Sequence, residues 1–136
     1  MNKEVDKEAN TIFSIIQTCS ERVYNQLGPY YRELHYQRAL EKEIECLPYL
    51  TVERERTIPI FYMTSKKQVI HVGDGRADLV VHSTRVNDPL VVIETKVRKT
   101  CADKAQLNRY VNGISSSKKA GVVVYFTDSL EFVWNN

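Results

Sequence analysis

Three ionisable residues, Asp78, Glu94 and Lys96, lie inside stretches of sequence that are otherwise apolar. Asp78 interrupts the stretch 77–81, and Glu94 and Lys96 interrupt the stretch 90–97. A charge inside an apolar strand costs free energy unless it is paired or binds a metal ion. The three residues therefore predict a chemical site, in which two carboxylates could bridge one hard divalent cation beside an amine.

The spacing of these residues predicts that they share one face of a hairpin. Turn-forming residues fill the segment 83–89, so the chain is expected to fold back around Val86. Positions 78 and 94 are then opposite each other, and opposite residues of an antiparallel pair share a face. Side chains alternate along a strand with a period of two, so Lys96 lies on the face of Glu94. A register shifted by one residue would turn Asp78 to the other face.

Length and composition predict a single soluble domain over residues 1–136. The chain is 43% hydrophobic and 26% charged, and its net charge of +2 neither requires nor excludes a nucleic-acid partner. The longest apolar stretches have the length of strands, so no membrane span is expected. The N-terminus is polar, without a secretory signal, and Cys19, Cys46 and Cys101 lack CxxC spacing. We therefore expect reduced thiols, no zinc site and an intracellular protein.

Hydrophobic periodicity predicts an α/β fold with one mixed central sheet flanked by helices. The expected helices span residues 5–27, 31–47 and 102–114. The expected strands are 52–62, 68–72, the strands of Asp78 and Glu94, 121–126 and a short edge strand 130–134, with turns at Lys66-Lys67 and Gly73-Asp74-Gly75. The element order is therefore α-α-β-β-β-β-α-β, and the helix 102–114 should form a right-handed crossover between parallel strands. Phe61 and Tyr62 are expected to pack in the core or at its rim.

Glu33 is a further acidic candidate, near the start of the second expected helix. It stands one turn before Tyr36, which begins an apolar stripe on that helix. A glutamate at this position can interact with the helix dipole, or it can be a third acid that reaches a metal ion. The residues alone leave both interpretations open.

Gln106 and Tyr110 stand one turn apart on the expected helix 102–114, and Lys99, Lys104 and Arg109 lie nearby in the sequence. An amide, a phenol and several cations suit contacts with a phosphodiester backbone. The alternative is a helix face exposed to solvent. The position of this helix directly after the strand of Glu94 favours the phosphate contacts.

Four motifs follow one another along the chain. They are Leu27-Gly28-Pro29-Tyr30-Tyr31-Arg32-Glu33-Leu34-His35-Tyr36, Arg76-Ala77-Asp78-Leu79-Val80-Val81, Ile93-Glu94-Thr95-Lys96 and Ala105-Gln106-Leu107-Asn108-Arg109-Tyr110. In this order they resemble the PD-(D/E)XK nuclease superfamily, and within it the GxxExxY branch of small microbial and viral proteins. Tyr30 stands where that branch has glycine, which suggests an altered start of the second helix. Gly75-Arg76-Ala77 replaces the usual proline before the first acid.

The resemblance implies a restriction-endonuclease-type core and a role for each motif residue. Asp78, Glu94 and the main-chain carbonyl of Thr95 would hold Mg²⁺ or Mn²⁺, with Glu33 completing the metal shell directly or through water. Lys96 would orient the attacking water or stabilise the transition state. The resemblance also implies that Gln106 and Tyr110 position the nucleic-acid strand.

The expected function is a metal-dependent nuclease that hydrolyses DNA, with RNA not excluded as the substrate. A homodimer is expected, because so small a domain covers little duplex and members of the superfamily often pair two active sites. A different class of function is also open, in which the nuclease fold serves as a catalytically silent binding or structural module in a nucleoprotein or virion assembly.

Overall fold

The computed structural model describes residues 11–135, in which two helices precede the sheet. Helix α2 spans Ile12–Leu27; the hydroxyl of Thr11 caps it by accepting from the amide of Ser14 at 3.2 Å. Helix α3 spans Glu33–Glu45. The part of the first expected helix that covers residues 5–10 lies outside the described residues.

The sheet has five strands in the order β1-β2-β3-β4-β5. The strands are β1 (Leu50–Met63), β2 (Val69–Ser83), β3 (Leu90–Lys96), β4 (Lys119–Phe126) and β5 (Leu130–Asn135). Helix α4 (Asp103–Gly113) connects β3 to β4, and this pair is parallel, whereas the other neighbouring strands are antiparallel. The parallel connection through α4 and the mixed α/β sheet confirm the expected fold class.

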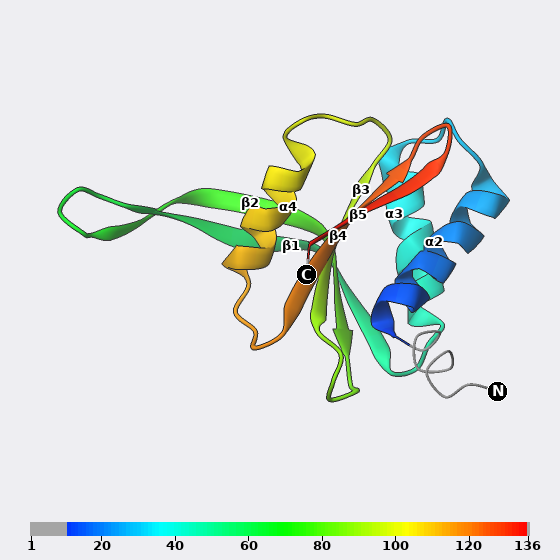
Figure 1. Cartoon of the computed structure of the whole chain (residues 1–136), viewed down its shortest axis with the longest axis horizontal. Helices are drawn as coiled ribbons and strands as arrows, with labels where there is room; N and C mark the ends of the chain where they lie inside the picture. The colour runs from blue at the N-terminus through cyan, green and yellow to red at the C-terminus, as the bar shows by residue number, and fades with distance from the viewer. Residues whose placement is uncertain (1–10, 136) are drawn as a thin grey trace.

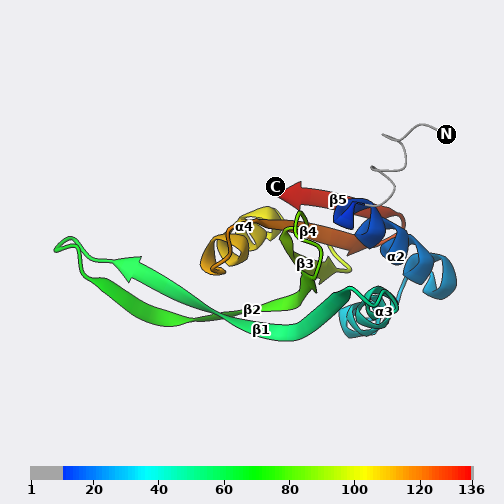
Figure 2. The same ribbon diagram turned by 90° about the horizontal axis from the view of Figure 1, so that it is seen from below.

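Helices cover both faces of this sheet (Figures 1 and 2). Helices α2 and α3 bury an apolar core against one face, in which Tyr36 stacks on Phe126 with ring centroids 4.4 Å apart. Helix α4 packs on the other face through Leu107, Tyr110 and Val111. Among the described residues, no helix combines the length and the apolar character that a membrane crossing requires.

The register of β2 and β3 is the one that the hairpin predicts. Leu79 is paired with Ile93 and Val81 with Val91, so the same register sets Asp78 opposite Glu94. The turn between Ser83 and Leu90 also lies where turn-forming residues predict it. A slip of one residue would turn Asp78 to the face opposite Glu94.

The expected turn at Gly73-Asp74-Gly75 is wrong, because β2 runs without interruption from Val69 to Ser83. The glycine at position 75 has a packing role instead: a Cβ there would lie 2.5 Å from Cε1 of Tyr110, so only glycine lets α4 approach the strand this closely. The expected strand 68–72 is therefore the outer half of β2, and the strand of Asp78 is its inner half, so three strands precede α4 among the described residues.

Strands β1 and β2 continue beyond the body of the protein as a two-stranded arm, which ends in the predicted turn at Lys66-Lys67 (Figure 1). Phe61 and Tyr62 lie on this arm, and their exposed fractions are 61% and 59%. The expectation that these two aromatic residues pack in or beside the core is therefore wrong.

We predict that Gly75→Ala destabilises the protein by about 1–3 kcal/mol, because the added methyl group must displace the ring of Tyr110. Gly73→Ala is the matched control: it changes the same residue type in the same strand, and its Cβ would have no heavy atom within 4 Å. Urea unfolding followed by circular dichroism measures both. Equal losses in the two variants would contradict this account of Gly75.

Candidate active site

The carboxylates of Asp78 and Glu94 each accept a hydrogen bond from a backbone amide of the neighbouring strand, at the point where β2 separates from β3. The amide of Asp78 donates to Oε2 of Glu94 at 2.8 Å, and the amide of Thr95 donates to Oδ2 of Asp78 at 2.8 Å. The hydroxyl of Thr95 also donates to Oδ2 of Asp78 at 3.1 Å. Each carboxylate thus replaces a main-chain acceptor of the neighbouring strand, and this fixes the orientation of both side chains.

Burial makes this pair of acids hard to ionise. It raises the pKa of Glu94 to about 8, and the nearby Asp78 carboxylate adds to this effect. Burial also raises the pKa of Asp78, although the two hydrogen bonds from Thr95 and the positive charge of Lys96 oppose the rise. Two acids in this environment favour binding a positive charge, because a cation would relieve both the burial and the repulsion.

Helix α3 approaches the acids from one face of the sheet, and Tyr36 fixes its start. The buried phenol of Tyr36 donates to the carbonyl of Gly28 at 2.6 Å and accepts from the amide of Tyr31 at 3.2 Å. Tyr30, between them, has a φ of 78°, the left-handed region that glycine adopts most easily. The backbone therefore has a glycine-type conformation at Tyr30, directly before α3.

Glu33 and Gln37 lie one turn apart on α3 and both reach the strands of the site. Glu33 accepts from the amide of Val97 at 3.3 Å, directly after Lys96 on the chain, while Gln37 donates to the carbonyl of Asp78 at 2.9 Å. The negative charge of Glu33 also contributes to raising the pKa of both site acids. Glu33 is therefore close to the acid pair, whereas Gln37 holds the backbone of Asp78.

Helix α4 approaches from the opposite face and contacts the lysine. The ammonium of Lys96 donates to Oε1 of Gln106 at 3.3 Å, and Nε2 of Gln106 donates to the phenol of Tyr110 at 3.2 Å. The amide of Arg76, two residues before Asp78, donates to the same phenol at 3.4 Å. This chain of hydrogen bonds links α4 to both strands that carry the acids.

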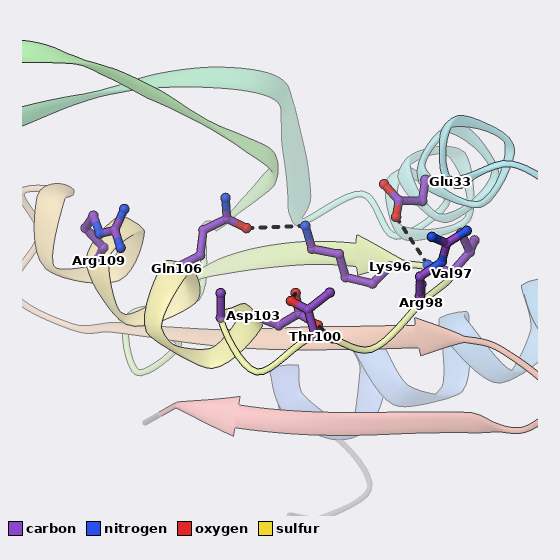
Figure 3. A pocket seen from close by; sticks show the side chains of 9 residues that line it. Glu33, Lys96, Val97, Arg98, Thr100, Asp103, Gln106 and Arg109 are labelled. Carbon is purple, nitrogen blue, oxygen red and sulfur yellow. Dashed lines mark hydrogen bonds between the residues drawn. The ribbon is translucent and has the colours of Figure 1, made fainter.

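A pocket of about 490 Å³ opens over Lys96 between α3 and α4 (Figure 3). Its charged and polar lining comes from both helices and from the segment that joins β3 to α4: the residues are Glu33, Lys96, Arg98, Thr100, Asp103, Gln106 and Arg109. Asp78 and Glu94 are not among the lining residues, and Glu94 is only 2% exposed. The lysine therefore lies between the buried acids and the open pocket.

The five expected nucleic-acid contacts do not lie together. Gln106 and Arg109 line the pocket. Lys104 is exposed on α4 outside the lining, whereas Tyr110 is 7% exposed and its phenol bonds inside the protein. The ammonium of Lys99 pairs with Glu131 and borders a different pocket, beside β5. The structure thus brings two of the five expected residues to the pocket over Lys96.

The donor atoms of the acid pair fit a hard divalent cation. Among the described residues, no group of three or more His, Cys, Asp and Glu side chains is placed to hold a metal ion. Mg²⁺ does not require such a group, because one or two carboxylates, waters and substrate phosphates commonly complete its shell. The hydrogen bonds described above use one oxygen of each carboxylate. Oδ1 of Asp78 and Oε1 of Glu94 therefore remain available to coordinate a metal ion.

Two residues of the site were missed by the sequence analysis. Gln37 could have been found from its spacing of four residues after Glu33, which places both on one helix face. Asp103 gave no such signal: it is buried and accepts from the amide and hydroxyl of Thr100 and from the phenol of Tyr125. Burial alone would raise the pKa of Asp103, but these hydrogen bonds lower it below its usual value. Asp103 thereby fixes the segment that forms one wall of the pocket.

The raised pKa of Glu94 predicts a pH-dependent stability for the metal-free protein. The folded state binds more protons than the unfolded state between pH 4.5 and about 8, so the free energy of unfolding falls as the pH rises through that window. The loss is on the order of a few kcal/mol. Urea unfolding in chelator at pH 5 and pH 8 measures it.

Glu94→Gln removes the titrating carboxyl group and should flatten the fall in the free energy of unfolding with pH. Glu45→Gln, on the exposed end of α3, should keep that fall. A wild-type stability that does not fall between the two pH values, or a Glu94→Gln variant that keeps the full fall, would contradict the assignment.

Comparison with known proteins assigns this arrangement to a family. The family model of the PD-(D/E)XK nuclease superfamily matches residues 10–134, which is nearly the whole chain. No curated protein matches the chain. The matched region contains Asp78, Glu94, Lys96 and both helices that contact them. The chain therefore belongs to the PD-(D/E)XK nuclease superfamily.

Proposed function

We propose that this protein is a metal-dependent nuclease that hydrolyses phosphodiester bonds of DNA, and that it belongs to the GxxExxY branch of its superfamily. The observation that carries the proposal is the buried acid pair Asp78 and Glu94 beside Lys96, a residue that lines a polar pocket. Nuclease-type function is the activity of the superfamily. The ion, the substrate and the cleavage itself are what the experiments below test.

Asp78, Glu94 and the carbonyl of Thr95 would hold Mg²⁺ or Mn²⁺, and Glu33 would contribute directly or through water. Carboxylate and carbonyl oxygens are the donors that both ions prefer. When bound, the ion supplies a water of lowered pKa and neutralises charge on the scissile phosphate. The role of the protein is to fix the carboxylates, which the backbone amides of Asp78 and Thr95 already do.

Lys96 would act on the reacting phosphate from the pocket side of the acids. Within residues 11–135 its ammonium has one side-chain hydrogen-bond partner, Oε1 of Gln106, so the remaining N–H groups could reach a phosphate oxygen or the attacking water. The phenol of Tyr110 holds Gln106 in turn. In this proposal Gln106 and Tyr110 are positioning residues, because they act through the lysine.

The pocket carries cations on opposite sides of Lys96, which suits a nucleic-acid strand. Arg98 lies beside Glu33, and Arg109 projects from α4 (Figure 3). Arginine is well suited to phosphate because its planar guanidinium can donate two parallel hydrogen bonds. These contacts would be the same for DNA and RNA, since both present the same phosphate groups.

We predict that Asp78→Asn and Lys96→Met each lower Mg²⁺-dependent cleavage of plasmid or branched DNA by at least about 10²-fold, because each removes a charge that stabilises the transition state. Lys42→Met is the matched control: it also removes a lysine charge, but from an exposed site at the far end of α3. Wild-type protein without cleavage, or site variants as active as the control, would contradict the enzyme proposal.

Titration calorimetry with Mn²⁺ tests the metal site separately from activity. Wild type should bind the ion and release a proton near pH 7, because Glu94, with a pKa of about 8, must ionise to coordinate it. The heat should therefore vary with the ionisation enthalpy of the buffer. Asp78→Asn and Glu94→Gln should remove the binding. No heat at millimolar Mn²⁺ in wild type would favour the alternative, a catalytically silent module.

A further inference from the structure

Tyr30 has the most exposed aromatic ring within residues 11–135, with 88% of its surface in water. Its φ of 78° is an outlier for a bulky residue, at a cost of about 1–3 kcal/mol. The ring gains little from burial. Its phenol donates to Oδ1 of Asp128 at 3.2 Å, but this hydrogen bond is exposed, and its net contribution is at most about 1 kcal/mol. Folding stability therefore gives no preference for tyrosine over glycine at this position.

Tyr30 lies at the same end of the sheet as the pocket over Lys96. It stands three residues before Glu33, which lines that pocket. Its partner Asp128 lies in the turn between β4 and β5, and β4 runs parallel to β3 with Tyr125 opposite Lys96. The segments that follow these two strands therefore leave one end of the sheet, where the connection between α2 and α3 also lies (Figure 1). The ring of Tyr30 is thus close to the segments that form the pocket.

The orientation of Tyr30 is fixed at both ends of the residue. The buried phenol of Tyr36 bonds to the carbonyl of Gly28 and to the amide of Tyr31, on either side of Tyr30 along the chain. The bond to Asp128 holds the hydroxyl at the other end of the side chain. A planar surface that is fixed before a ligand binds loses little conformational entropy when the ligand covers it.

We propose that Tyr30 is a stacking platform for an unpaired nucleobase that neighbours the phosphate in the pocket. The proposal rests on the proposed nuclease function and narrows its substrate. A base inside a continuous duplex already stacks on both faces, so it must leave the helix before a protein ring can stack on it. The preferred substrate is therefore single-stranded or branched nucleic acid, with an unpaired nucleotide beside the bond that is cleaved.

The charges around Tyr30 fit a nucleotide. Arg32 is exposed two residues further along the chain, and Arg98 lines the pocket beside Glu33 (Figure 3). A guanidinium can bind phosphate oxygens through two parallel hydrogen bonds. Asp128 would repel a phosphate at the phenol itself. The ring therefore suits the uncharged base, whereas the arginines suit the phosphates on its strand.

A protein partner fits this surface less well. Tyr30 and its half-exposed neighbours Tyr31 and Leu34 together offer less than about 400 Å² of surface. A specific protein interface covers about 800 Å² on each partner. One base needs only one ring, and such a stack is worth about 1–3 kcal/mol when it is removed by mutation.

Fluorescence anisotropy in chelator, where metal-dependent cleavage does not occur, tests the proposal with a short labelled single strand and a blunt duplex of the same sequence. Tyr30→Gly should weaken binding of the single strand at least about fivefold and leave binding of the duplex within about twofold. Tyr30→Phe keeps the ring and should bind the single strand as wild type does. Tyr62→Ala is the matched control, because it removes a 59% exposed tyrosine from the β1–β2 arm.

A fluorescent adenine analogue in the single strand reports the contact itself, since stacking on an aromatic ring quenches its emission. We expect quenching by wild type and Tyr30→Phe, and its loss in Tyr30→Gly. Urea unfolding shows whether Tyr30→Gly keeps the fold. Its free energy of unfolding should stay within about 1 kcal/mol of wild type, because relief of the strained φ offsets the lost hydrogen bond and the greater freedom of glycine in the unfolded chain.

Four results would overturn the proposal: no binding of the single strand by wild type, equal losses for single strand and duplex in Tyr30→Gly, an unquenched analogue, or a Tyr30→Gly variant that is strongly destabilised. Failure of the nuclease proposal gives a different pattern. A wild type that binds and quenches the single strand as expected but cleaves nothing contradicts the nuclease proposal alone. A wild type that cleaves, with Tyr30→Gly binding as tightly as wild type, contradicts the stacking proposal alone.

Discussion

The burial of two carboxylates at one point of a sheet is the constraint on which the rest of this structure depends. Asp78 and Glu94 accept hydrogen bonds from main-chain amides that would otherwise bond to carbonyls of the neighbouring strand. Burial raises the pKa of both acids, and nearby negative charge adds to the rise. Packing in the remainder of the fold offsets this cost. A cation bound by the pair would offset that cost, because its charge would attract both carboxylates.

Helices on opposite faces of the sheet stabilise this arrangement at different atoms. On one face, Gln37 of α3 bonds to the carbonyl of Asp78, and Tyr36 fixes the turn before the helix. On the other face, Gln106 of α4 bonds to the ammonium of Lys96. The acids and the lysine are thus each fixed by a different helix. The site residues beside the pocket are therefore held in position before any ligand binds.

The separation of β2 from β3 explains two features of the structure, the position of the acid pair and the exposed arm. At Asp78 the strand leaves β3, so the carboxylates can enter the gap and meet the backbone. Beyond that point β2 continues only with β1, and Gly75 lets α4 pack closely at the base of the resulting arm. The acid pair at the fork and the exposed apolar arm beyond it are thus consequences of one departure from regular pairing.

Local sequence determined much of the fold and the main chemistry of the site. The turn centred on Val86 determined the register that sets Asp78 opposite Glu94, because both positions lie eight residues from the turn centre. Apolar β-branched residues likewise marked β3 and β4, which are buried on both faces and therefore lack alternation. Glu33 could be placed at the start of a helix, but its approach to Val97 depends on how α3 packs on the sheet.

The remaining features were decided only by tertiary contacts. A glycine in a turn and a glycine beneath a helix have the same sequence signature, and only the position of Tyr110 shows that Gly75 lies beneath α4. Lys99 follows the site strand closely in sequence, yet its ammonium pairs with Glu131 of β5. The exposure of Phe61 had no local signal either, because an aromatic strand residue is normally buried. Sequence thus determined which residues alternate and where the chain turns, whereas the packing of distant elements decided which side chains share a pocket and which remain in water.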